Sequence, residues 1–156
     1  MILDGFELIR LDERSCTDEL LRQIAGIDES IFPGNPWGTE SLAGSAKADY
    51  DHLTAVVGTE GGRAAAFGLI RCFDDAEVIR IAVEPDKRRR GLGSIILADM
   101  LGEAAKRGIT NIFLEVRSAN TPAIELYKKA GFVTEGVRRG YYHEPKDDAL
   151  IMRYTC

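Results

Sequence analysis

The sequence VIRIAVEPDKRRRGLGSIILA, residues 78–98, decides how the rest of the chain is arranged. Residues 78–83 are mostly β-branched and apolar, which predicts a strand, and Pro85 ends it because proline has no N–H to donate to a ladder. Apolar residues then recur at helical spacing from Leu92 onward. The predicted order is a strand, a tight basic loop and a helix that begins close to two glycines.

The start of this helix predicts an anion-binding site. Its first N–H groups lack partners within the helix and lie at the positive end of the helix dipole, and Gly91 and Gly93 let a ligand approach the main chain closely. The spacing Arg88-x-x-Gly91-x-Gly93 matches neither the nucleoside-triphosphate loop nor the dinucleotide fingerprint. The basic residues 87–90 are also compatible with a solvated charge run or a nucleic-acid patch, but their place directly before the glycines favours a pyrophosphate.

This loop resembles the acetyl-CoA pyrophosphate loop of the GNAT acetyltransferases. A second stretch, LEVRSANTPAIELYKKAGF at residues 114–132, is similar to a block of the branch of that family that acetylates protein N-termini. The tail from Arg138 to Met152 resembles the same branch, as do FP at 32–33 and PWGTE at 36–40. The chain is thus similar to the bacterial ribosomal-protein alanine N-acetyltransferases and their archaeal N-terminal acetyltransferase relatives. The resemblance is strong over the second half of the chain and weak over its N-terminal part.

Length and composition are those of one domain. The chain has 156 residues, 45% of them hydrophobic, and we expect residues 1–156 to form a single N-acetyltransferase domain with a full core. A net charge of −5 argues against a nucleic acid as the main partner. The three cysteines are far apart, and neither histidine has a partner at metal-ligand spacing, so no metal is expected. With no signal peptide and no apolar stretch of about 18 residues, the sequence predicts a cytoplasmic protein that does not bind a membrane.

Hydrophobic periodicity and turn residues predict the remaining elements. We expect strands near residues 6–11, 52–58, 63–73, 111–116, 132–138 and 149–154, and helices near 20–31, 39–47, 91–107 and 121–130. Ser15 or Thr17 is predicted to cap the first helix, Thr39 the second and Thr121 the last. The predicted fold class is α+β, an α/β three-layer arrangement in which a mixed, mostly antiparallel central sheet is flanked by helices, as in GNAT proteins.

Acetyl transfer from a thioester to an amine needs a base for the amine and a proton for the departing thiolate. Glu115 is the predicted base, because the resemblance implies this role and its apolar strand is expected to be buried on both faces. A structural carboxylate bound to Arg80, to Arg117 or to a backbone amide is the alternative. Tyr127 is the predicted acid, since the resemblance implies that it protonates the sulfur and a tyrosine pKa of about 10 keeps it protonated. A packed ring is the alternative for Tyr127.

The resemblance also implies the binding residues. Acetyl-CoA, the cosubstrate, is expected along the main chain of Ile81, Ala82 and Val83, with its pyrophosphate at the loop of Arg88, Arg89, Arg90, Gly91, Leu92, Gly93 and Ser94. Asn120 is implied to contact the same molecule, although alone it has the ordinary interpretation of a turn residue. The acceptor is expected against Trp37, Arg138, Tyr141 and Tyr142. Trp37 is also compatible with a core or loop plug, and the other three with a structural hairpin.

The sequence therefore predicts an enzyme that uses acetyl-CoA to acetylate the N-terminal α-amino group of a protein, of the ribosomal-protein alanine type. The transfer is expected to be direct, without a covalent enzyme intermediate. Two alternatives stay open: acetylation of a small-molecule amine, and a non-catalytic acyl-CoA-binding module. The presence of both Glu115 and Tyr127 argues against the non-catalytic alternative. The acceptor partner is expected to be a protein or peptide N-terminus, and no oligomeric state is predicted.

Overall fold

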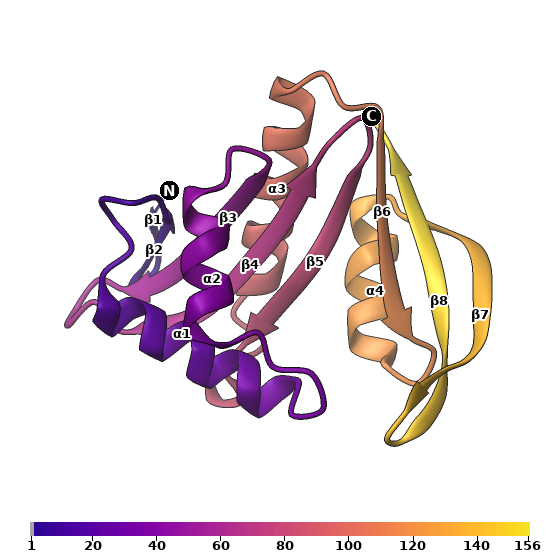
Figure 1. The fold of residues 1–156 in the computed structure, drawn as a ribbon, viewed down its shortest axis with the longest axis horizontal. Helices are drawn as coiled ribbons and strands as arrows, with labels where there is room; N and C mark the ends of the chain where they lie inside the picture. The colour runs from indigo at the N-terminus through magenta and orange to yellow at the C-terminus, as the bar shows by residue number, and fades with distance from the viewer. Residues whose placement is uncertain (1) are drawn as a thin grey trace.

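The computed structural model describes residues 2–156 as a central sheet with helices on both sides (Figure 1). Its helices are α1 (Asp18–Ile31), α2 (Gly38–Lys47), the 3-10 helix η1 (Pro85–Lys87), α3 (Leu92–Lys106) and α4 (Thr121–Ala130). Its strands are β1 (Ile2–Leu3), β2 (Phe6–Arg10), β3 (Asp51–Gly58), β4 (Ala64–Cys72), β5 (Ala76–Val83), β6 (Asn111–Arg117), β7 (Val133–His143) and β8 (Lys146–Thr155). Only the short β1 and η1 were not predicted from the sequence.

The strands form one sheet in the order β1-β2-β3-β4-β5-β6-β8-β7. All neighbouring pairs are antiparallel except β5 and β6, which run parallel because the chain crosses over through α3 between them. The prediction of a mixed, mostly antiparallel sheet is confirmed, and the consecutive strands β3, β4 and β5 are antiparallel neighbours.

Two hydrophobic clusters fill the two sides of the sheet. One contains Ile96 and Met100 of α3 and Tyr127 of α4. The other contains Ile24 of α1 and Leu42 of α2. Figure 1 shows α1 and α2 in front of the sheet, with α3 and α4 behind it. The predicted three-layer arrangement is therefore confirmed.

The parallel strands β5 and β6 pair over a short length only. Their register joins Ala76 to Ile112 and Glu77 to Phe113, and no later residues of these two strands pair within the described chain. Beyond these pairs the two strands diverge, and Figure 1 shows them splayed toward their C-terminal ends. Main-chain groups along the later part of each strand are consequently free of a partner across this opening.

A bulge in β5 changes which way its side chains face. Opposite β4, Leu69 pairs with Arg80 and Ile70 pairs with Val78, so Ile79 is left without a partner in that strand. Val78 packs into the cluster under α3 and α4, whereas Arg80 contacts α1 on the opposite side of the sheet. Without the bulge, Val78 and Arg80 would face the same side of the sheet, because residues two positions apart in a regular strand do so.

One predicted helix cap was correct and two were wrong. The Thr17 hydroxyl accepts a hydrogen bond from the Leu20 N–H at 3.2 Å and caps α1, as predicted. Asn120, not Thr121, caps α4, because its Oδ1 accepts from the Ala123 N–H at 3.3 Å and asparagine is among the strongest capping residues. Thr39 does not cap α2, because this helix begins at Gly38, directly after Trp37, and has no side-chain cap.

The final hairpin is longer than predicted. Strand β7 extends to His143 and β8 begins at Lys146, so Tyr141 and Tyr142 lie within β7, directly before the last strand. Register shifts interrupt the pairing between Arg138 and Tyr142. The sequence missed this extension because its residues are mostly polar and show no hydrophobic alternation.

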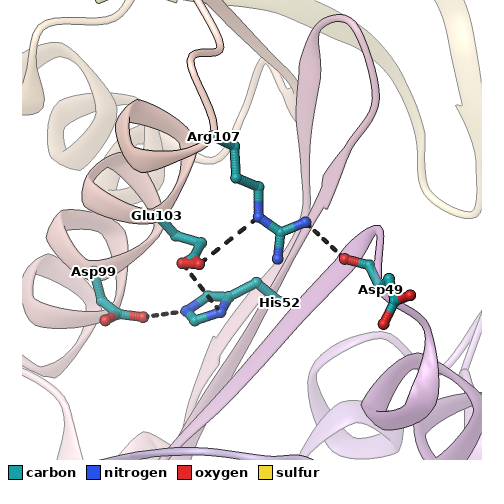
Figure 2. A network of polar contacts seen from close by, with 5 residues as sticks. All are labelled: Asp49, His52, Asp99, Glu103 and Arg107. Carbon is teal, nitrogen blue, oxygen red and sulfur yellow. Dashed lines mark hydrogen bonds and ion pairs between the residues drawn. The ribbon is translucent and has the colours of Figure 1, made fainter.

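A polar network joins β3 to α3 far from the diverging strands (Figure 2). The buried His52 bonds Asp99 through Nε2 at 2.7 Å, and its Nδ1 lies 3.9 Å from a Glu103 oxygen. Arg107 approaches Glu103 at 3.7 Å and donates to the Asp49 carbonyl at 2.7 Å. His52 is therefore part of the packing of α3 on the sheet.

No helix among residues 2–156 is long and apolar enough to cross a membrane.

Candidate active site

The basic loop leads from β5 into the exposed first turn of α3. Arg89 and Gly91 both have left-handed backbone conformations, with φ of 64° and 77°, and Gly91 is the N-cap residue. The first helical hydrogen bond runs from the Ile95 N–H to the Gly91 carbonyl at 3.1 Å, so the N–H groups of the three residues between them have no partner within the helix. Gly93 sits close to Leu126 of α4. The loop therefore presents consecutive main-chain donors at the positive end of a helix.

The charged side chains of this loop differ in their contacts. Arg90 lies over the Phe6 ring at 5.9 Å, and Lys87 is 3.3 Å from the carboxylate of Asp86. Arg88 and Arg89 are exposed, and no ion pair or hydrogen bond engages either side chain within residues 2–156. These two arginines are the ones free to meet an anion at the helix start. Leu92, by contrast, is buried, so only its main chain is available to a ligand.

A mostly apolar hollow of about 290 Å³ continues from this turn along α3 and α4. Ser94 lines the hollow near the start of α3. Other residues that line the hollow include Leu97, Leu101, Leu126 and Lys129. A ligand held at the helix start therefore has room to extend over this surface.

Glu115 lies on β6 with its side chain 25% exposed. The prediction that this strand is buried on both faces was wrong, because its residues alternate between buried and half-buried. Leu114 and Val116 face the cluster under α3 and α4, so Glu115 faces the opposite side of the sheet. Its Oε1 is 3.0 Å from the Nε of Arg138, a residue predicted only as part of the acceptor wall.

A second carboxylate, Glu77, lies on the neighbouring strand near Glu115. The pKa of Glu77 is raised, first because surrounding groups shield it from water in part and second because of the negative charge of Glu115. The residue that pairs with Glu77 on β4 is Arg71, and Arg71 makes a two-pronged ion pair with Asp51 at 2.8 and 2.9 Å. The face of the sheet that carries Glu115 therefore holds several charged groups.

Tyr127 lies on α4 and is only 9% exposed. Its ring meets Phe132 edge-on, with 5.8 Å between the centroids. Burial, and to a smaller extent the neighbouring Tyr142, raises the pKa of Tyr127 to about 12. No hydrogen bond of its hydroxyl is found within residues 2–156. Tyr127 is thus a protonated phenol in the layer behind the sheet.

Tyr142 lies on the face of the sheet that carries Glu115. Burial raises the pKa of Tyr142, and the negative charge of Glu115 raises it further. The Arg117 guanidinium lies 4.1 Å over the Tyr142 ring and donates to the Pro145 carbonyl at 2.7 Å. Arg117 is two residues after Glu115 on β6, so the ring of Tyr142 lies on the same face as Glu115, at the hairpin end of the sheet. Tyr127 lies on the other side of the sheet, in the layer of α3 and α4.

The other predicted acceptor residues lie around this end of the sheet. Tyr141 is 48% exposed and meets Tyr142 edge-on at 5.1 Å, and Arg138 is 5.8 Å from its ring. Trp37 is half-buried beside the cluster under α1 and α2, with the Arg71 guanidinium 5.5 Å from its ring. Both of its interpretations, a loop plug and a wall residue, agree with this position.

The predicted acetyl-CoA contacts outside the basic loop fall in two places. Ile81, Ala82 and Val83 form the end of β5 beyond its last pair with β6. Asn120 is exposed at the start of α4 and uses Oδ1 for its cap, which leaves its side-chain N–H₂ group for a ligand. Among residues 2–156 no group of three or more His, Cys, Asp or Glu side chains is arranged to hold a metal ion.

Sequence reasoning missed Glu77 and the contact between Arg138 and Glu115. Glu77 precedes the stretch that the motif covers. Only the parallel pairing of β5 with β6 indicates that it lies near Glu115, because this pairing joins Glu77 to Phe113, two residues before Glu115. Arg138 comes 23 residues after Glu115 in number, and only the antiparallel return through β8 brings the two side chains together. No local pattern encodes either contact.

Comparison with known proteins gives consistent relatives. The profile of the Acetyltransferase (GNAT) family matches residues 21–132. The chain is 37% identical over 120 residues to the ribosomal protein bS18-alanine N-acetyltransferase of Escherichia coli strain K12, covering 75% of this chain and 79% of that protein. It also resembles the crystal structure of the ribosomal-protein-S18-alanine N-acetyltransferase from Escherichia coli, with a TM-score of 0.79, 30% identity and coverage of 96% and 93%. Arabidopsis thaliana NAA60, crystallised with a bisubstrate analogue, shares the fold at a TM-score of 0.82, with 16% identity and coverage of 96% and 97%.

Proposed function

This chain belongs to the Acetyltransferase (GNAT) family and is an acetyl-CoA-dependent N-acetyltransferase, and from this premise we propose that its acceptor is the N-terminal α-amino group of a protein. The name of the Escherichia coli relative supports an alanine at the start of a ribosomal protein as the acceptor. The proposal treats residues 1–156 as one catalytic domain that meets its acceptor in the cytoplasm, where ribosomal proteins are made.

The residues present fit the donor. Acetyl-CoA brings an acetyl thioester at one end and a pyrophosphate at the other. The unpartnered N–H groups that follow Gly91, with the free guanidinium groups of Arg88 and Arg89, suit the pyrophosphate. The unpaired edge of Ile81 to Val83 suits an extended arm that adds to it like a strand. Asn120 is proposed to donate its free amide to the same arm.

Glu115 is proposed to accept the proton that the acceptor ammonium must lose before its nitrogen can attack. An α-amino group has a pKa of about 8, so most of it is protonated at neutral pH and a base accelerates the reaction. The partly exposed Glu115 can receive that proton directly or through one water. Arg138, 3.0 Å away, is proposed to hold the carboxylate in place.

Two further groups are proposed to complete the transfer. As the nitrogen bonds to the carbonyl carbon, a main-chain N–H near Val83 donates to the oxygen that gains negative charge. When the bond from carbon to sulfur breaks, Tyr127 gives its proton to the thiolate, the nitrogen releases its second proton to solvent, and Tyr127 later regains a proton from solvent. A pKa of about 12 keeps this phenol protonated and ready to donate at neutral pH.

One observation carries the proposal: Glu115 lies on β6 beyond its last pair with β5, and Tyr127 lies on the opposite side of the sheet. A thioester between the strands would meet the base from one side and the acid from the other. Arg138 and Tyr141 are exposed at 56% and 48%, so this side is open enough for a chain to enter, which favours a peptide over a small amine.

The test is acetylation of a peptide set that differs in its first residue. The protein is incubated with acetyl-CoA and peptides that begin with Ala, Ser, Met or Pro and carry one internal lysine, and the modified position is read by mass spectrometry. We expect acetyl transfer to the free N-terminus, with Ala preferred, and none to a peptide whose N-terminus is already blocked. Modification of the lysine alone, or of free amines but no peptide, would refute the proposal.

A further inference from the structure

A buried ion pair between α1 and β5 takes no part in the chemistry above. Asp28 is fully buried at 0% and Arg80 is 8% exposed, and an Asp28 oxygen accepts a hydrogen bond from Arg80 Nη1 at 2.5 Å. Removing two charges from water is costly, so such a pair persists only when its remaining donors and acceptors are also satisfied. The partners that satisfy them indicate what the pair does.

Those partners all belong to the loop between α1 and α2. The second Asp28 oxygen accepts the Trp37 N–H at 2.6 Å, and Arg80 Nη2 donates to the Asn35 carbonyl at 2.5 Å. The Arg80 guanidinium also lies 4.4 Å from the centre of the Phe32 ring. Between these contacts, residues 33–36 are exposed to solvent. The conformation of the segment 32–37, here called the anchor loop, thus depends on the ion pair.

The anchor loop lies beside the candidate active site. Figure 1 shows the connection between α1 and α2 at the end of the molecule where β5 and β6 splay apart. Its Trp37 ring is 5.5 Å from the guanidinium of Arg71, and Arg71 is the sheet partner of Glu77, which lies near Glu115. Arg80 itself directly precedes the stretch 81–83 proposed to hold the donor. The ion pair therefore ties this loop to the strand that borders the reaction.

We propose that Asp28 and Arg80 are positioning residues for the acceptor, holding the anchor loop as the wall opposite the hairpin of Tyr141 and Tyr142. This inference rests on the proposed acceptor side of the sheet. A guanidinium is required because its fork reaches the carboxylate and the Asn35 carbonyl together while its flat face lies on Phe32, which the point charge of a lysine cannot do. A purely structural pair would affect stability and leave acceptor binding unchanged.

The first test is the variant Arg80→Lys, compared with Arg22→Lys as a matched control on the exposed face of α1. A wall displaced by an ångström or more should raise the KM for an N-terminal Ala peptide at least about tenfold, while the KM for acetyl-CoA changes by less than about twofold. The control should leave both values unchanged. Equal KM values for the peptide in wild type and Arg80→Lys, in a folded variant, would overturn the inference.

Trp37 supplies a second readout, because it is the only tryptophan of the chain. Titration of the wild type with a peptide that lacks aromatic residues should change its fluorescence in a saturable way, with a dissociation constant about tenfold weaker in the variant. An unchanged dissociation constant in the variant would count against the inference. If Arg80→Lys does not fold, the double change Asp28→Leu with Arg80→Met removes both buried charges and is measured instead.

This design separates the inference from the proposed function. If the wild type acetylates only a small amine, the peptide acceptor is wrong, and the same KM comparison is then made with that amine. An increase at least as large in the Arg80 variant supports the positioning role, and an unchanged KM overturns it whatever the acceptor is.

Discussion

At the scale of single residues, the site depends on one carboxylate and one phenol in different environments. Glu115 is partly exposed and paired with Arg138, whereas Tyr127 is almost fully buried against Phe132. The sequence motif predicted both residues, but it did not predict these surroundings. Arg138 comes close to Glu115 only because β8 pairs with both β6 and β7. The alternation of buried and half-buried residues along β6 becomes apparent only once one face of the sheet is known to be open.

Replacing Glu115 with Gln should abolish the base while keeping the size of the side chain. We expect kcat to fall by about 10²- to 10⁴-fold, since that is the usual contribution of a general base, and acetyl-CoA binding to stay as in the wild type. Steady-state kinetics and calorimetric titration with acetyl-CoA measure the two quantities. Glu135→Gln is the matched control, because Glu135 is on the neighbouring hairpin and pairs with Arg153. Full activity of Glu115→Gln would remove this residue from the mechanism.

Replacing Tyr127 with Phe should lower kcat by about 10²-fold or more, because the thiolate loses its proton donor. The folded pKa of about 12 lies above the ordinary value of 10.0, so the wild-type phenol stays protonated through pH 10 and begins to lose its proton only near pH 11. The pH profile of wild-type kcat should therefore show no loss from Tyr127 between pH 6 and about pH 10. Tyr154→Phe, which also removes a hydroxyl beside Phe132, should keep kcat. An unchanged kcat in Tyr127→Phe would contradict the assigned role.

At the scale of elements, the position of the anion site depends on how closely α3 sits on β4. Gly68 of β4 leaves room for the helix, because a Cβ there would come within 2.3 Å of Ile96 and 2.5 Å of Met100. The strand, loop and helix of this region follow directly from their sequence, since periodicity and Pro85 mark each boundary. The bulge at Ile79 and the short pairing of β5 with β6 were not predictable, because they arise from how neighbouring strands twist and pair.

Changing Gly68 to Ala should push α3 away from the sheet. Overpacking of this kind costs about 1–3 kcal/mol of unfolding free energy, and it should also raise the KM for acetyl-CoA because the helix start moves. Urea denaturation and steady-state kinetics measure the two effects. Gly102→Ala on α3 itself meets no atom within 4 Å and should be neutral or stabilising by up to about 1 kcal/mol. A Gly68→Ala protein as stable as the wild type would show that α3 can shift without cost.

At the scale of the whole molecule, the layers separate the two halves of the reaction. Helices α3 and α4 form the layer that holds the anion site and Tyr127, while α1, the anchor loop and Glu115 lie on the other side of the sheet. The element types were predictable from hydrophobic periodicity and turn residues, and the three layers from the resemblance to GNAT proteins. The contact of Asp28 with Arg80 was not, since the two are 52 positions apart in the chain and Asp28 is an acidic residue in an otherwise ordinary amphipathic helix.

The most direct measurement is a crystal structure with coenzyme A joined to the N-terminus of an Ala peptide. We predict that the sulfur lies between β5 and β6 within about 3.5 Å of the Tyr127 hydroxyl. The peptide nitrogen should lie within hydrogen-bond distance of Glu115, directly or through one water. The pyrophosphate should lie on the main chain that follows Gly91. An arm bound elsewhere on the sheet, with Glu115 and Tyr127 both turned away from it, would contradict the account.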